Sequence, residues 1–185
     1  MVNSKQKGNA WENTIAKVIR NKFIPSDFDP KTSHSLVHRT PMSGGHVERG
    51  DLIIKPPVWK WFPWFLELRN RQSWSWKNVM EKGVDSVIGK WFQEDAIDKC
   101  HPYDNDASYP RCPLLLFTRN QEKVYGCARV VDLRDVIEPA LWNLEPVLML
   151  SGQLHMIFSF DQFLACYQDT PDGITDDINK YLGIS

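Results

Sequence analysis

Three charged residues in the first half of the chain have the types and spacing that phosphodiester hydrolysis requires. Asp51 precedes a short apolar segment, and Glu67 and Arg69 end a second one after a proline-rich connector. Side chains alternate between the faces of a β-strand, so Glu67 and Arg69 share one face and Leu68 points to the other. If the two segments pair as a hairpin, Asp51 approaches Glu67. Two converging carboxylates suit a hard divalent ion such as Mg²⁺, which can activate water against a phosphodiester.

The elements that must position these residues can be predicted from the apolar pattern. Apolar residues at helical spacing predict a helix over 9–23. Residues 51–55 and 63–69 are the two strands of the predicted hairpin. A helical region follows over roughly 77–99, with a break near Gly83. This order places one helix before the acidic residues and one after them.

The second half of the chain supplies further predicted strands. A continuous apolar segment at 114–118 is typical of a buried central strand, and 124–131 is predicted to be its neighbour. We expect a helix up to Pro139, a last strand at 154–160 and a short helix to residue 167. The pattern predicts an α/β fold with a mixed central sheet of four or five strands flanked by helices.

Basic and glycine-containing segments near Asp51 are candidates for phosphate contacts. The loop Arg39-Thr40-Pro41-Met42-Ser43-Gly44-Gly45 has two glycines, which permit close approach of the backbone to a ligand. The side chains of Arg39, Ser43, Arg49 and Arg71 could donate hydrogen bonds to phosphate oxygens. An ordinary glycine-rich turn is the alternative interpretation of this loop.

The order of these segments resembles that of a known nuclease superfamily. The chain contains G-N-A-W-E-N-T-I-A-K, then R-T-P-M-S-G-G, then G-D, and finally E-L-R-N-R. This arrangement resembles the PD-(D/E)XK nucleases, and among them the phage and archaeal-type Holliday junction resolvases and related endonucleases. The resemblance covers roughly residues 4–130. One position departs from the pattern, because Arg69 stands where the superfamily usually has lysine.

The resemblance implies a restriction-endonuclease-like fold and a set of site residues. It implies that Asp51, Glu67 and the carbonyl group of Leu68 bind Mg²⁺, for which Mn²⁺ can substitute. It also implies that Glu12 on the first helix projects towards this site, although a surface carboxylate near the helix N-terminus is the alternative. Gln93 on the later helical region is a further candidate, with a surface glutamine as the alternative. The resolvases of this type are homodimers that act on branched DNA.

The arginine at position 69 limits the chemistry of the site. A guanidinium group stays protonated in proteins, so Arg69 cannot act as a general base. It can still bind a non-bridging phosphate oxygen and stabilise the charge that develops during hydrolysis. Arg69 is therefore compatible with altered catalysis, and equally with lost catalysis and retained DNA binding.

Composition supports an ordinary globular protein with an uneven charge distribution. The 185 residues carry a net charge of −1, and 42% of them are hydrophobic. Residues 1–92 contain 15 Lys and Arg against 8 Asp and Glu, whereas the remainder contains 7 against 15. The acidic motif thus lies in a half with net charge +7, which suits a nucleic-acid partner. Its seven tryptophans, out of eight in the chain, could stack on DNA bases or pack in the core.

The remaining expectations concern organisation and location. The length predicts one nuclease-like domain over 1–185, with a core at about 4–130 and a C-terminal extension, 131–185, packed on it. No apolar segment approaches the roughly 18 residues of a membrane helix, and the N-terminus lacks a signal-peptide segment. We therefore expect a cytoplasmic protein of a bacterial, archaeal or phage-infected cell. The four cysteines lack regular spacing and are expected to be reduced.

Three functions are compatible with the sequence. The first is an Mg²⁺-dependent DNA endonuclease, for which the resemblance implies selectivity for branched DNA such as Holliday junctions. The second is a catalytically weak or inactive PD-(D/E)XK module that binds DNA. The third is a protein-interaction domain that uses the aromatic connector or the acidic C-terminal region. Salt-sensitive DNA affinity separates the first two from the third, because phosphate contacts release counterions.

Overall fold

A five-stranded mixed sheet forms the centre of the protein. The computed structural model describes residues 4–41, 50–100, 112–119, 122–138, 140–150, 154–167 and 169–184. The strand order is β3-β4-β5-β7-β6, with β3 and β4 parallel and the other neighbours antiparallel. The bounds are β3 Trp64–Asn70, β4 Cys112–Thr118, β5 Tyr125–Arg129, β6 Pro146–Leu150 and β7 His155–Ser159. This confirms the predicted restriction-endonuclease-like α/β fold.

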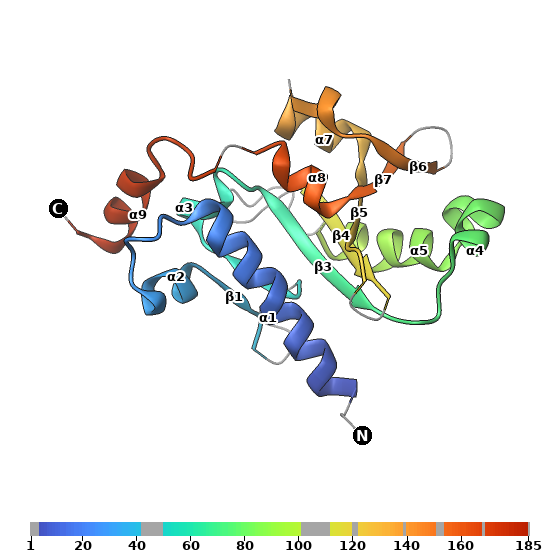
Figure 1. Ribbon diagram of the computed structural model, residues 1–185, viewed down its shortest axis with the longest axis horizontal. Coiled ribbons are helices and arrows are strands. Elements are labelled where there is room, and N and C mark those ends of the chain that lie inside the picture. Colours follow the sequence, from blue (N-terminus) through green and yellow to red (C-terminus); the bar gives the residue numbers. More distant parts are fainter. Residues whose placement is uncertain are drawn as a thin grey trace.

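Helices cover both faces of this sheet (Figure 1). Helix α1, Ser4–Phe23, packs on the face to which Trp64, Leu66 and Leu68 of β3 point. The opposite face of β3 carries Glu67 and Arg69 and is covered by the helices that follow β3. Alternation along this strand therefore separates the apolar residues that pack towards α1 from the charged residues that face the helical layer.

The helical region after β3 consists of five short pieces rather than one helix. They are α4 Trp76–Lys82, the 3₁₀ turn η1 Gly83–Asp85, α5 Val87–Lys90, the π-helix η2 Trp91–Ile97 and α6 Asp98–Cys100. The predicted break near Gly83 is confirmed, since Gly83 has φ +54° and ends α4. Val79, Ile88 and Phe92 are fully buried against the sheet.

The predicted hairpin between residues 51–55 and 63–69 is wrong, because these two segments lie in different sheets. Strand β2, Leu52–Ile54, pairs with β1, Val37–Arg39, in a separate two-stranded sheet. The connector forms a short helix, α3 Pro56–Trp59, because prolines are well suited to the first turn of a helix. One backbone bond still joins the two segments, since the amide of Asp51 donates to the carbonyl of Leu66 at 3.0 Å.

Further elements lie where the sequence analysis predicted none. Residues 30–36, for which no element was predicted, form α2 Pro30–Leu36, whose N-cap is the Asp29 side chain. Residues 146–150 form β6, an edge strand whose sequence P-V-L-M-L is apolar throughout although most of its side chains are exposed, so it lacks the apolar–polar alternation of a half-buried strand. The first helix also begins earlier than predicted, at Ser4.

The C-terminal region contributes to the central sheet and packs against the N-terminal half. Its helices are α7 Val130–Ile137, α8 Phe160–Ala165 and α9 Ile174–Leu182, with a 3₁₀ turn, η4, at Ala140–Asn143. Strands β6 and β7 lie in the same sheet as β3. Helix α9 lies against α3, where Asp177 accepts hydrogen bonds from Lys60 at 2.7 Å and from Trp61 at 3.3 Å. The aromatic connector, residues 56–63, therefore packs against the rest of the protein, with Trp59 and Trp61 partly buried against the core.

Two smaller observations complete the description. Among the described residues, no helix is long and apolar enough to cross a membrane. All four cysteines are free thiols, as the sequence analysis predicted.

Replacing Gly89 by alanine should destabilise the helical layer that covers Glu67 and Arg69. A Cβ atom at Gly89 would lie 2.2 Å from the backbone carbonyl oxygen of Val84, which cannot rotate away. We expect a loss of about 1–3 kcal/mol in the free energy of unfolding, as for other overpacked sites. Gly8→Ala is the matched control, because its Cβ would meet only Glu12, at 3.8 Å. Urea denaturation of both variants tests this, and equal midpoints would contradict it.

Candidate active site

Asp51 is held between β1 and β3 by its backbone. Gly50 has φ +87°, a backbone conformation that residues with a side chain rarely adopt. The chain turns at this glycine before it enters β2. The amide of Thr40 donates to the carbonyl of Asp51 at 3.0 Å, and the Thr40 hydroxyl donates to the carbonyl of Gly50 at 2.8 Å. With the amide of Asp51 bonded to Leu66, the residue is fixed on both sides. These bonds aim its carboxylate at β3.

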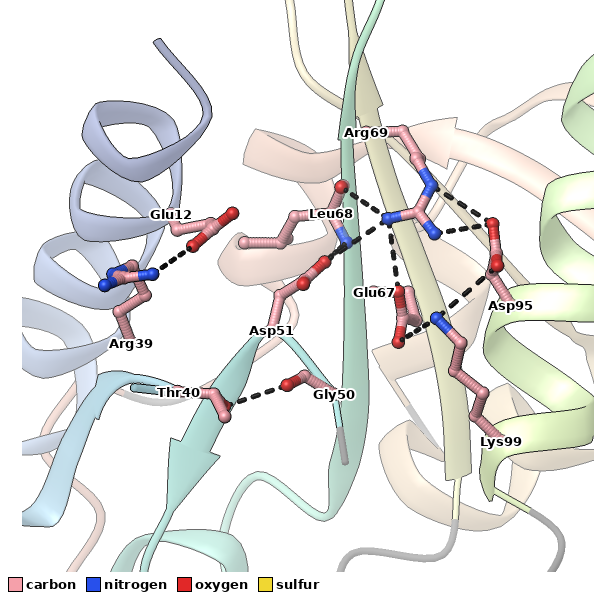
Figure 2. Close-up of polar contacts among 10 residues, drawn as sticks. All are labelled: Glu12, Arg39, Thr40, Gly50, Asp51, Glu67, Leu68, Arg69, Asp95 and Lys99. Atoms are coloured by element: carbon pink, nitrogen blue, oxygen red, sulfur yellow. Dashed lines mark hydrogen bonds and ion pairs between the residues drawn. The ribbon is translucent and has the colours of Figure 1, made fainter. Parts of the chain in front are cut away.

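The carboxylates of Asp51 and Glu67 converge beside β3, as predicted (Figure 2). The amide of Leu68 donates to Oδ2 of Asp51 at 2.7 Å. The Nη1 atom of Arg69 lies 3.5 Å from that same oxygen and 3.2 Å from Oε2 of Glu67. One guanidinium nitrogen therefore bridges the two acids. A hairpin is not needed for the two carboxylates to converge. The backbone hydrogen bond from Asp51 to Leu66 and the bond from the Leu68 amide to the Asp51 carboxylate bring Asp51 against β3.

Arg69 is fixed by contacts on three sides. Its Nη1 donates to the carbonyl of Leu68 at 3.0 Å. Asp95 on η2 accepts from Nε at 3.1 Å and lies 2.5 Å from Nη2, a bidentate arrangement. The side chain is only 20% exposed, so it is held in one orientation rather than extended into solvent. Asp95 was not among the predicted site residues.

Lys99 is the second residue that the sequence analysis missed. It lies on α6, 32 positions after Glu67, and its Nζ is 3.0 Å from Oε1 of Glu67. It is also 3.4 Å from Oδ1 of Asp95. The sequence contained one relevant signal, because Asp95 and Lys99 have the i,i+4 spacing of a helical ion pair. The site thus contains an amine from a helix in addition to the arginine in the strand.

Burial dominates the electrostatics of the two acids. It raises the pKa of Glu67 to about 7, helped by the charge of Asp51 and opposed by Lys99 and Arg69. Burial likewise raises the pKa of Asp51, against the opposing effects of the Leu68 amide and Arg69. For Arg69, burial alone would lower the pKa, but the surrounding carboxylates outweigh it and raise the pKa. The pair therefore holds less negative charge at neutral pH than two free carboxylates would.

The donor atoms of this site fit a hard divalent cation. Oε2 of Glu67 is buried and has no hydrogen-bond partner, although it lies close to Arg69. The Asp51 and Glu67 carboxylates and the Leu68 carbonyl are all oxygen donors, the kind that Mg²⁺ prefers. Within the described part of the chain, no group of three or more His, Cys, Asp or Glu side chains is placed to hold a metal ion. Any ion here would thus depend on two carboxylates, a carbonyl and water.

Glu12 and Arg39 lie together at the edge of the site. The Glu12 carboxylate faces Asp51 and Leu68 from α1 (Figure 2) and is paired with Nη1 of Arg39 at 3.5 Å. Glu12 is close enough to Asp51 for the two charges to interact. Burial and the charge of Asp51 both raise the pKa of Glu12. Arg39 also donates to the side chain of Asn9 at 3.3 Å. Arg39 therefore orients Glu12 in this structure.

The other predicted residues do not join this cluster. Gln93 is exposed and donates to Asp98 at 2.9 Å, rather than to Asp51 or Glu67. Arg71 is exposed just beyond the end of β3, where its amide donates to the carbonyl of Thr118. Ser43 and Arg49 lie outside the described residues.

Comparison with known families identifies the class of protein to which this fold and site belong. A family model described as "Phage putative PDDEXK endonuclease" matches residues 3–144, and the chain belongs to this family. The PD-(D/E)XK superfamily predicted from the sequence is thereby confirmed. The matched range contains Asp51, Glu67, Arg69, Asp95 and Lys99. The chain has no significant match among curated proteins or among solved structures.

Family membership has general consequences for the protein. The family is one of endonucleases, so a nuclease activity and contact with DNA are implied. Nucleases of this superfamily generally depend on a divalent metal, which agrees with the oxygen donors described above.

The raised pKa of Glu67 predicts a pH-dependent stability in metal-free protein. The pKa of Glu67 is about 7 in the folded protein, against an ordinary value of 4.5. Because the folded state binds this proton more tightly than the unfolded state, protonation of Glu67 stabilises the fold. This contribution is complete below pH 4.5 and is lost as the pH rises through 7. At about 1.4 kcal/mol per pKa unit, the loss is up to about 3 kcal/mol.

Denaturation with guanidinium in EDTA at pH 5 and pH 8 measures this loss. The wild type should lose unfolding free energy between these values, and Glu67→Gln should lose distinctly less. Glu94→Gln is the control, because Glu94 is an exposed residue of η2. If Glu67→Gln kept the full pH dependence of the wild type, the assignment of this effect to Glu67 would be wrong.

Proposed function

We propose that this protein is a metal-dependent DNA endonuclease that hydrolyses phosphodiester bonds at the Asp51–Glu67 site. The observation that supports this most directly is the convergence of two buried carboxylates and one carbonyl with two cationic side chains. Oxygen donors for a divalent ion and positive charge for a phosphate are thus brought together in one place. Mg²⁺ is the proposed ion, and Mn²⁺ is the proposed substitute.

The proposed ligands are Asp51, Glu67 and the carbonyl of Leu68. When bound, the ion would lower the pKa of a coordinated water and polarise the scissile phosphate. The backbone bonds to Thr40 and Leu66 hold Asp51 in position for this role. Arg69 and Lys99 lie beside these proposed ligands and would supply positive charge for the phosphate.

Arg69 and Lys99 would share the work of the superfamily lysine. Asp95 fixes Arg69 through two of its nitrogens, so the guanidinium is oriented to bind a non-bridging phosphate oxygen. An ammonium group, unlike a guanidinium, can release a proton. Lys99 is therefore the residue proposed to orient the attacking water and to exchange a proton with it. Glu12, oriented by Arg39, is proposed to hold a further water at the edge of the site.

The phosphate contacts away from the acids are proposals as well. Arg71 lies exposed beyond β3, Arg39 ends β1, and Ser43 and Arg49 come from the segment between β1 and Asp51 in sequence. A branched DNA substrate and a homodimer that addresses both halves of a junction are carried over from the sequence resemblance. Cytoplasmic location is likewise an expectation for an enzyme that acts on DNA.

A second candidate function has one observation in its favour. Arg69 already bridges Asp51 and Glu67, so the acids are neutralised without a metal ion. A module of this kind could bind DNA and no longer cleave it. Arg69→Lys separates the two candidates, because a gain in cleavage places residue 69 in a working site. Absence of cleavage in both proteins, with DNA binding retained, favours the binding module.

Asp51→Ala should abolish cleavage. The change removes a proposed ligand and an acceptor for the Leu68 amide, and we expect a loss of at least about a hundred-fold in rate. The measurement is cleavage of a synthetic four-way junction and a matched linear duplex with Mg²⁺, Mn²⁺ or EDTA. Equal cutting of both substrates by the wild type would contradict the proposed preference for junctions. Cutting in EDTA would contradict the proposed dependence on a metal ion. Sedimentation of the same samples tests the homodimer.

Lys99→Ala should slow cleavage by about a hundred-fold while leaving DNA affinity nearly unchanged. The reason is that Lys99 contacts Glu67 and acts on charge that develops during the reaction. Lys90→Ala on α5 is the control, because Lys90 is an exposed lysine on the same helical layer. Single-turnover rates at saturating Mg²⁺ measure the effect. Equal rates for both variants would exclude Lys99 from catalysis.

A further inference from the structure

A small aromatic pocket lies beyond the acidic site and has no role in the function proposed above. Its volume is about 220 Å³, below the roughly 300–1,000 Å³ of pockets for drug-sized ligands. This size suits a single planar ring system. Its lining residues come from the segment after β3 and from the β4–β5 turn: Trp74, Ser75, Trp76, Arg119, Glu122, Lys123 and Tyr125.

The aromatic wall of the pocket is rigid. Trp74 is buried, and its indole nitrogen donates to the carbonyl of Thr118 at 3.4 Å. Trp76 packs edge-on against Trp74 and Tyr125, with ring centroids 5.3 and 4.9 Å apart. Both Trp76 and Tyr125 remain partly exposed. A ring that enters the pocket would therefore meet aromatic surfaces that are already fixed in place, so little ordering would be needed.

The rim of the pocket is cationic. Arg119 and Lys123 are exposed, and neither forms an ion pair with any residue in the described ranges. Glu122 is the one acidic residue in the lining. The hydroxyl of buried Thr118 bonds to the carbonyls of Glu122 and Lys123, both at 3.2 Å, and so holds the turn against the sheet. Aromatic surface bordered by two cations matches a base with its flanking phosphates.

The pocket lies on the same face of the sheet as the acids. Arg69 is the register partner of Phe117, and Phe117 is the partner of Tyr125. These three residues form one row across neighbouring strands. Two strand separations of about 4.8 Å place Tyr125 roughly 10 Å from Arg69. A DNA strand rises about 3.4 Å per nucleotide in a duplex, so the pocket is within a few nucleotides of the acidic site.

We infer that this pocket binds one unstacked nucleobase of a DNA strand whose scissile phosphate lies at the Asp51–Glu67 site. The inference deepens the proposed function, because it names the feature of DNA that the protein selects. A paired base in a continuous duplex cannot enter a pocket without leaving its stack, which costs free energy, whereas an unpaired base pays least. DNA with an unpaired nucleotide next to the cleavage position is therefore the preferred substrate.

Binding without cleavage tests the pocket separately from the nuclease activity. Fluorescence anisotropy in EDTA compares a labelled duplex that carries one unpaired thymine with the same duplex fully paired. The wild type should bind the bulged duplex more tightly. Trp76→Ala should weaken that complex by about five- to a hundred-fold, which is the range for loss of one base–aromatic stack, and leave the paired duplex unaffected. Tyr181→Ala on α9 is the control, because Tyr181 is an exposed aromatic residue elsewhere, 48% accessible.

Lys123→Ala is the second variant, because it removes a rim cation and leaves the aromatic packing intact. It should reduce binding of the bulged duplex and flatten the salt dependence. Equal wild-type affinity for both duplexes would overturn the inference, as would equal effects of Trp76→Ala and Tyr181→Ala. Preference for the bulged duplex without cleavage would support the pocket and refute the nuclease. Cleavage without any preference would do the reverse, and binding of a proline-rich or aromatic peptide in place of DNA would assign the pocket to a protein partner.

Discussion

The charge balance around Glu67 is the constraint on which the rest of this structure depends. A carboxylate that is 1% exposed is stable only if nearby groups compensate for the loss of water. Arg69 and Lys99, each about 3 Å away, offset part of that loss, and Asp95 holds both cations in place. The four residues come from β3, η2 and α6, so the charge cluster also joins the sheet to its helical layer.

The helical layer is shaped by this requirement. A regular helix over the whole segment would be simpler, but the chain is divided into five pieces, one of which is a π-helix. Asp95 lies within the π-helical turn, and such turns often occur at functional sites. Gly89 permits close contact with Val84, which brings α5 and η2 onto the sheet. The π-helical turn carries Asp95, and Asp95 holds the two cations that contact buried Glu67.

The departure from the superfamily pattern at position 69 becomes intelligible in this setting. An arginine alone in the strand cannot accept the proton of a nucleophilic water. In three dimensions it stands beside an amine from a helix, and both cations contact the same carboxylate. Under the proposed function, the strand would contribute a fixed phosphate-binding group, and the helix would contribute the group able to exchange protons. The row of residues on this face runs through buried Phe117 to Tyr125, so the aromatic pocket and the acidic site lie at two ends of the same row.

The sequence by itself determined the class of fold, the superfamily and the acidic pair. Alternation in β3 and helical spacing in α1 are properties of short stretches of chain, whereas the superfamily followed from the resemblance in the order of the segments. Only the tertiary structure decided that β2 pairs with β1, that Lys99 contacts Glu67 and that Gln93 donates to Asp98. The reason is physical: these outcomes depend on which distant segments are brought together by burial, and a contact across 32 residues leaves no periodic trace in the sequence.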